Sequence, residues 1–120
     1  MCGIFGYKGH QSGAEKILLQ GLQRLEYRGY DSAGLRVSDG SHEQVIKSIG
    51  KVSQLAQKVS QTIDATQQYT RGIAHTRRAT HGGISEENTH PHYPASHTFT
   101  IVHNGIIENY HKIKQDLIAK

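Results

Sequence analysis

The sequence predicts a mixed α and β fold, and three observations lead to that class. Short apolar stretches rich in β-forming residues alternate with longer stretches in which apolar residues recur at helical spacing. Thirteen glycines against two prolines indicate tight turns and close backbone contacts rather than disorder. The length of 120 residues is that of one domain, and an apolar content of 35% allows a modest core.

The first two predicted elements are a strand and a helix. "CGIFGY" at residues 2–7 is short and apolar, which is typical of a buried strand. Ser12 stands three residues before Glu15, and this capping-box spacing predicts the start of a helix. Apolar residues then follow on one helical face as far as Tyr27, and Gly29 is placed to end the helix.

The rest of the chain continues the alternation. "DG" indicates a hairpin loop between the second and third strands, and the two residues after it lengthen that loop beyond the two-residue type. The remaining predicted elements are strands at 32–38, 43–49, 71–76 and 98–104 and helices at 52–63 and 108–120. Residues 76–97 have no apolar period, which is typical of a functional or disordered loop. The sequence ends inside its last predicted helix, so we expect it to be incomplete.

Charge and cysteine content argue against several classes of protein. The formal net charge is +4 and the basic residues are scattered, whereas a nucleic-acid-binding protein more often carries a dense basic stripe with interleaved aromatic residues. No apolar run approaches the roughly 18 residues that a membrane span requires, and no secretory leader is visible. A single cysteine cannot form an intrachain disulfide. We therefore expect a cytoplasmic protein without nucleic-acid or membrane partners.

The only cysteine is Cys2, directly after the initiator methionine. A free cysteine is often simply a small buried apolar residue, but position two allows a second interpretation. Initiators are commonly removed ahead of small side chains, which would leave a thiol and a free α-amine on one carbon. An α-amine titrates near about 7.7–8.0 and a thiol near about 8.5. The amine could therefore act as the base for its own nucleophile, and "GIFGY", buried as a central strand, would hold this terminus still.

Two further segments carry groups that an amide-cleaving site needs. In "VHNGIIEN", Asn104 offers a side-chain amide and Gly105 a closely approachable backbone N–H, which together make a candidate oxyanion hole with donors worth about 2.7–4 kcal/mol each. Taken by itself, this pair favours a plain Asn-Gly turn. In "IAHTRRATHGG", an arginine beyond a strand suits capture of a carboxylate, and a surface arginine in a flexible loop is the alternative.

Five segments together resemble one family. They are "MCGIFGY", "LQRLEYRGYDSAGL", "GIAHTRRATHG", "NTHPH" and "VHNGIIENY", spread along essentially the whole chain. They are similar to the N-terminal glutaminase domain of the glutamine–fructose-6-phosphate aminotransferases, class II glutamine amidotransferases of the N-terminal-nucleophile hydrolase type. "EYRGYDSAG" is the most specific segment. The resemblance implies an α+β fold, a four-layer αββα sandwich, of which residues 1–120 would form about the first half. The rest of the domain and the sugar-phosphate isomerase domain would be absent.

The resemblance also implies a reaction and its residues. Cys2, freed of Met1, would attack the side-chain amide of glutamine, and the released ammonia would pass to the missing domain to make glucosamine 6-phosphate from fructose 6-phosphate. No cofactor or metal is implied, and the full-length enzyme is expected to be a cytoplasmic homo-oligomer. The implied catalytic residues are Cys2, Arg28, Gly29, Asn104 and Gly105, and the implied substrate-binding residues are Arg77, Thr80, His81 and His90.

Some features depart from the family pattern or suggest other functions. Arg78 stands where the family normally has a tryptophan that closes the site, which predicts a leakier or weaker site. The partial domain is also expected to be unstable and inactive alone, because half a sandwich exposes apolar sheet faces. Alternatives are a metal site built from His90, His92 and neighbouring histidines, an inactive remnant or binding module, and a purine-pathway amidotransferase, against which "EYRGYDSAG" argues.

Overall fold

Four strands form one antiparallel sheet in the order β1-β4-β2-β3. The computed structural model describes residues 2–64, 66–79 and 82–120. Strand bounds are β1 Gly3–Lys8, β2 Ser32–Ser38, β3 Glu43–Ile49 and β4 Arg71–Arg77. This is the mixed α and β fold predicted from the sequence, and it comprises one sheet and one helical layer of the implied sandwich.

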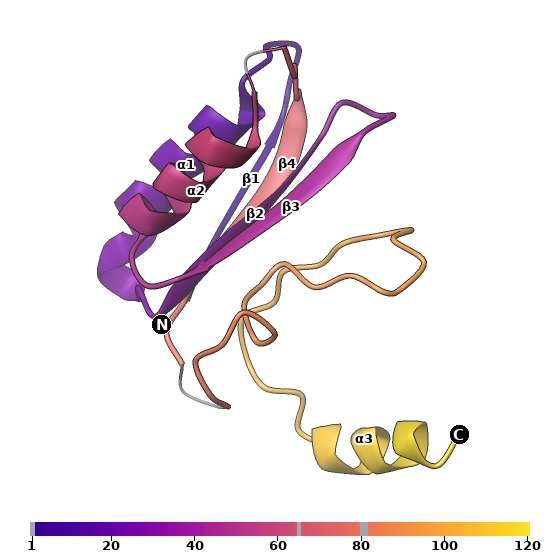
Figure 1. The fold of residues 1–120 in the computed structure, drawn as a ribbon. Coiled ribbons are helices and arrows are strands. Elements are labelled where there is room, and N and C mark those ends of the chain that lie inside the picture. The colour runs from indigo at the N-terminus through magenta and orange to yellow at the C-terminus, as the bar shows by residue number, and fades with distance from the viewer. Residues whose placement is uncertain (1, 65, 80–81) are drawn as a thin grey trace.

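Two helices cover one face of the sheet (Figure 1). They are α1, Ala14–Leu25, which continues as a 3-10 turn at Glu26–Arg28, and α2, Val52–Thr62. The chain after β4 passes across the opposite face, and the last helix, α3 at Tyr110–Ile118, lies apart from the sheet (Figure 1). Every residue of α3 is exposed, so the helix buries no apolar side chain against the rest of the described chain.

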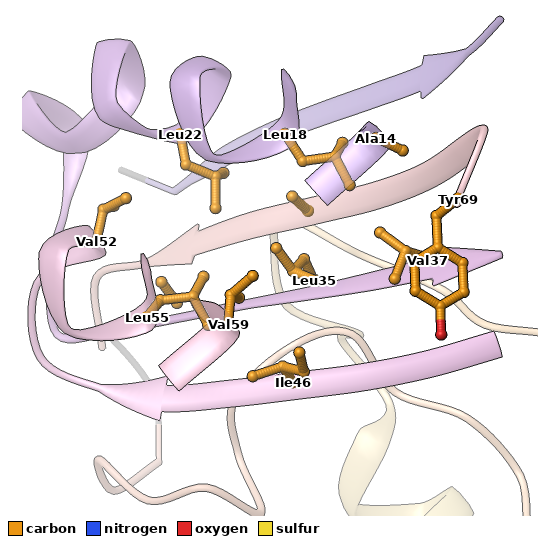
Figure 2. Packing of buried hydrophobic residues seen from close by; sticks show 12 residues of the cluster. Ala14, Leu18, Leu22, Leu35, Val37, Ile46, Val52, Leu55, Val59 and Tyr69 are labelled. Atoms are coloured by element: carbon orange, nitrogen blue, oxygen red, sulfur yellow. The ribbon is translucent and has the colours of Figure 1, made fainter. Parts of the chain in front are cut away.

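The core lies between the two helices and the sheet (Figure 2). Leu18 and Leu22 of α1 and Leu55 of α2 point at the sheet and are completely buried. Alternate residues of β2 meet them, because successive side chains of a strand point to opposite faces. Full burial of each leucine contributes about 1.5–3 kcal/mol. The odd-numbered positions of β2 thus build the core, and Gly34 faces the other side.

β1 is an edge strand of the described sheet, so its predicted central position is wrong. Its burial alternates along Gly3–Lys8, and the side chain of Ile4 is 44% exposed. One face of the strand packs on α1, where the ring of Phe5 lies against Gly21. The opposite face is open in the described part of the chain, which is why this apolar strand is only half buried.

The predicted capping box is also wrong. The N-cap of α1 is Gly13, with a φ of 86° and no side-chain cap, and Glu15 is buried rather than reaching back to Ser12. A left-handed residue at this position turns the chain so that the Ala14 N–H donates to the carbonyl of Tyr69 at 3.0 Å. A tertiary contact therefore satisfies one of the free amides at the start of this helix, in the absence of a side-chain cap.

The predicted strand at 98–104 does not form. Its one pairing is an isolated bridge in which His92 and Ile101 exchange two backbone hydrogen bonds of 2.9 Å. Phe99 and Ile101 stay half exposed, at 57% and 50%. The β-forming residue types are present, but no described strand edge lies alongside them to complete a ladder.

The predicted end of the first helix and the hairpin loop are confirmed. The N–H of Gly29 donates to the carbonyl of Glu26 at 3.0 Å and closes the 3-10 turn. Ser38 pairs with Glu43, so the loop has four residues, and an Asp39 carboxylate oxygen accepts the amides of both Ser41 and His42. Within the described residues, no helix is long and apolar enough to cross a membrane.

Candidate functional site

A cavity of about 630 Å³ opens beside the N-terminus, on the face of the sheet opposite α1 and α2. His75 and Arg77 point into it from β4, because residues two apart share a face of a strand. The residues that line it and were predicted from the sequence are Cys2, Arg77, His90 and Gly105. The other lining residues, which are outside the implied catalytic and substrate-binding set, are His75, Arg78, Gly82, Asn88, His92, His103, Ile106, Ile107 and Tyr110.

Cys2 is held against the backbone of Arg78. The Arg78 N–H donates to Sγ at 3.3 Å, and Sγ lies 3.6 Å from the Arg78 carbonyl oxygen. Gly29 makes this position possible, because a Cβ there would lie 2.6 Å from Cβ of Arg78 and would push the chain away. The contact to sulfur uses the backbone of residue 78, so it does not require the tryptophan expected at this position. The substitution by arginine therefore affects the site only through its side chain, which forms part of the cavity wall.

Asn104 connects Cys2 to the interior of the sheet. Its side-chain Nδ2 donates to the carbonyl oxygen of Cys2 at 3.1 Å, and its Oδ1 lies 2.8 Å from Nε2 of His75. Gly105 follows in a bend with a φ of 127°, a conformation that residues with a side chain rarely adopt. The Asn104 amide therefore contacts the backbone of Cys2, and the glycine that follows it lines the same cavity as Cys2.

Arg77 is a buried cation at the rim of the cavity, 7% exposed. Its Nη1 donates to the carbonyl of Gly83 at 2.8 Å, and Asn88 Nδ2 donates to the same oxygen at 3.0 Å. The guanidinium therefore anchors the loop that follows β4 as well as lining the cavity. Both features suit an arginine that meets a carboxylate at a fixed place.

His90 sits over the sheet in a short stack of imidazoles. Its ring centroid lies 4.2 Å from that of His75, nearly parallel, and 4.3 Å from that of His92. The N–H of His103 donates to its Nδ1 at 3.3 Å. Gly34 of β2 lies directly beneath, and a Cβ there would come within 2.0 Å of the His90 carbonyl oxygen. The glycine thus lets this segment rest on the sheet.

The segment "EYRGYDSAG" holds the backbone around the site in place, and its own residues do not line the cavity. A Glu26 carboxylate oxygen accepts the Val52 N–H at 2.7 Å at the start of α2, where a negative charge is favourable. An Asp31 carboxylate oxygen accepts the Ala79 N–H at 2.7 Å and fixes the chain just after Arg78. With Gly29 beneath Arg78, the motif holds the backbone that holds the thiol.

Three imidazoles of the site resist protonation. Burial lowers the pKa of His75 below its usual range. Burial, together with the neighbouring rings of His75 and His92, lowers the pKa of His90 to about 3. Burial and the positive charge of Lys47 lower the pKa of His92. All three rings are therefore neutral near pH 7.

We expect the free energy of unfolding to fall as the pH drops below about 6.5. The unfolded chain protonates these rings near pH 6.5, whereas the folded protein takes up the same protons only at lower pH, down to about 3 for His90. Below 6.5 the unfolded state therefore binds more protons, and acid shifts the equilibrium towards it. Urea unfolding at about pH 7.5 and about pH 5.0 measures the difference.

The matched variants for this experiment are His90→Gln and His10→Gln. The first removes a buried ring and should reduce the pH dependence, whereas the second removes an exposed histidine and should leave it unchanged. An equal pH dependence in the two variants would contradict the prediction.

The structure brings most of the sequence-predicted residues to one place. Cys2, Arg77, His90 and Gly105 line the cavity, and Asn104 contacts Cys2. Gly29 reaches the site through Arg78, whereas Arg28 in the 3-10 turn is not among the lining residues. Thr80 and His81 lie outside the described residues.

His75 is the main lining residue without an implied role in the reaction, since it entered only as one of the neighbouring histidines of the metal-site alternative. The signal was present, since His75 stands two residues before Arg77 in a predicted strand and so shares its face. The metal-site alternative finds no support in the described ranges, where no three His, Cys, Asp or Glu side chains are grouped so that they could hold an ion.

Solved structures similar to this chain are amidotransferases. Glutamine phosphoribosylpyrophosphate amidotransferase from B. subtilis matches with a TM-score of 0.78 and 26% identity, over 99% of this chain and 25% of that one. A structure described as the allosteric regulatory enzyme of purine biosynthesis matches with a TM-score of 0.81 and 30% identity over the same shares. The fold is thus that of the class II glutamine amidotransferases, a class with the N-terminal-nucleophile hydrolase fold.

Curated relatives narrow the class. The glutamine–fructose-6-phosphate aminotransferase (isomerizing) of Geobacillus kaustophilus is 51% identical over 119 residues, and that of Shouchella clausii is 50% identical over 119 residues. Each match covers 99% of this chain, which spans 19% of the length of those relatives. Over nearly its whole length the chain is therefore similar to the N-terminal region of glutamine–fructose-6-phosphate aminotransferases. No protein-family model matches it.

Proposed function

We propose that this chain carries the glutamine-hydrolysing site of a glutamine–fructose-6-phosphate aminotransferase, with Cys2 as the nucleophile. The observation that carries the proposal is that Cys2 and Gly105 line one cavity beside the N-terminus, while the Asn104 amide contacts the Cys2 backbone. Identities near 50% to aminotransferases, against 26% and 30% to the purine-pathway structures, favour this branch over the purine alternative.

The proposed reaction begins once Met1 has been removed. The Cys2 sulfur forms a bond to the side-chain amide carbon of glutamine, and the α-amine of the same residue takes the thiol proton. The oxyanion that forms lies between Asn104 Nδ2 and the Gly105 N–H. Only one hydrogen of Nδ2 is used for the Cys2 carbonyl oxygen, so the second remains for substrate.

Collapse of this intermediate breaks the carbon–nitrogen bond. The α-amine returns its proton to the departing nitrogen, ammonia leaves, and a γ-glutamyl thioester remains on Cys2. Water then attacks the thioester and releases glutamate, which restores the thiol. The α-amine is a suitable base because amines of this type titrate near about 7.7–8.0, close to the working pH.

Substrate binding is assigned to the other side of the cavity. Arg77 would pair with the glutamine α-carboxylate, Thr80 and His81 would fold over the substrate, and His90 would lie beside it. Arg28 and Gly29 would complete the catalytic segment. Residues 1–120 would be part of a glutaminase domain. The ammonia would be used on fructose 6-phosphate in a domain outside residues 1–120, within a cytoplasmic homo-oligomer.

The test is covalent labelling by an electrophilic glutamine analogue. In the intact protein that carries this sequence, we expect the analogue to modify Cys2 and excess glutamine to protect it, because both occupy one cavity. Peptide mass spectrometry locates the label and also reports whether Met1 has been removed. Arg77→Met should label more slowly, because the carboxylate loses its partner. Absence of label at Cys2, or label that glutamine does not prevent, would contradict the proposal and favour an inactive remnant.

A further inference from the structure

His75 is a buried polar group that the proposed reaction does not use. It lies on β4 with only 1% of its surface exposed, on the face that carries Arg77. Nδ1 has no hydrogen-bond partner of good geometry among the described residues. Nε2 makes the contact of 2.8 Å to Asn104 Oδ1. Besides an interaction with the backbone of His103, Asn104 is the one side-chain hydrogen-bond partner of His75 among the described residues. Burial of an imidazole is costly, so each such partner matters to the position of the ring.

Cys2, Asn104 and His75 form a chain of two hydrogen bonds, and the Cys2 carbonyl determines which atom donates in each. The backbone oxygen of Cys2 can only accept, so the Asn104 amide must present Nδ2 to it. Oδ1 then faces His75, and Nε2 must carry the hydrogen. Burial keeps the pKa of His75 low, so the ring is the neutral Nε2–H tautomer near pH 7. Each link thereby fixes the direction of the next.

We infer that His75 is a positioning residue that holds the Asn104 amide in the orientation needed for the oxyanion hole. The inference rests on the proposed function, because it names what fixes one of the two oxyanion donors. An amide rotated by half a turn would present Oδ1, an acceptor, to a developing negative charge and would repel it. Asn104 itself is exposed, so packing does not prevent this rotation. The Cys2 carbonyl opposes it at Nδ2, and the His75 Nε2–H adds the second contact, at Oδ1.

Two substitutions separate this role from the stacking of His75 on His90. His75→Phe keeps an aromatic ring for the stack of 4.2 Å but has no donor for Asn104. His75→Gln loses the ring but can bring an amide N–H close to the place of Nε2. If the hydrogen-bond donor matters, His75→Phe lowers activity and His75→Gln retains it. If the stack matters, the order is reversed.

The experiment compares three quantities in the intact protein. For His75→Phe we expect kcat for glutamine hydrolysis to fall by about 10–100-fold, part of the loss caused by removing an oxyanion donor, with KM within about threefold. Alkylation of Cys2 by iodoacetamide proceeds at a tetrahedral carbon without an oxyanion and should keep its rate. His75→Gln should keep kcat within about fivefold of the wild type.

Each outcome decides the inference. Full kcat in His75→Phe would overturn it, and so would equal losses in both variants or a parallel loss of iodoacetamide reactivity, which would indicate a structural role. An inactive wild type would contradict the proposed function instead. Crystal structures of wild type and His75→Phe then decide the inference without turnover. The inference requires that Asn104 Nδ2 contacts the Cys2 carbonyl oxygen in the wild type and that this orientation is lost in His75→Phe.

Discussion

Replacing Cys2 with serine should lower glutamine hydrolysis by about 10³-fold or more, because a hydroxyl is a far weaker nucleophile than a thiol that its own α-amine can deprotonate. Serine can still accept the Arg78 N–H, which now donates to Sγ at 3.3 Å, so the fold should persist. Initial rates of glutamate and ammonia release measure the loss, and the thermal midpoint reports whether the fold is intact. Turnover equal to the wild type would exclude Cys2 as the nucleophile.

A second variant tests the amine separately from the sulfur. Inserting one lysine between Met1 and Cys2 keeps the thiol but converts its α-amine into an amide, which is no base. We expect a loss of similar size, about 10²–10³-fold at least, because general-base assistance is worth about 10²–10⁴-fold. Mass spectrometry confirms that the extension is retained. Unchanged turnover in a protein with a blocked Cys2 amine would require a different base.

Gly34→Ala should disturb both the fold and the site. The added Cβ would lie 2.0 Å from the His90 carbonyl oxygen, and β2 cannot move aside because β4 and β3 flank it. The segment that carries His90 must therefore lift from the sheet. Overpacking of this kind costs about 1–3 kcal/mol of unfolding free energy. We also expect turnover to fall, because His90, His92 and the contact with His103 move together.

Gly6→Ala is the matched control in the same sheet. A Cβ at Gly6 would meet its nearest atom at 3.9 Å, which is ordinary contact, so this substitution should be neutral or slightly stabilising. Urea unfolding and glutamine turnover of both variants in the intact protein make the comparison. Equal behaviour of the two variants would show that the close approach of His90 to β2 does not matter.

Elements with a strong local pattern were predicted well. The apolar face of α1 and the Gly29 stop fix a helix and its end at almost the predicted residues, because spacing and backbone freedom are properties of a short segment. The strand at 98–104 failed for the opposite reason. A ladder needs a partner edge, and no composition of seven residues supplies one.

The candidate site shows the same division. Cys2 and the Asn104–Gly105 pair carry rare chemistry in short motifs, and the resemblance to one family linked them across about a hundred residues. His75 was passed over because an isolated histidine in a strand has no motif. Its importance comes from contact with Asn104, which is 29 positions away in the sequence.

By itself, the sequence determined the fold class, the family and the chemical groups of the site, because these follow from residue types and local spacing. The tertiary structure decided which groups meet. β1 became an edge strand, Gly13 displaced the expected cap, and His75 was directed at the amide beside Cys2. The reason is physical, since burial and hydrogen-bond partners depend on segments far apart in the chain, and only packing brings those segments together.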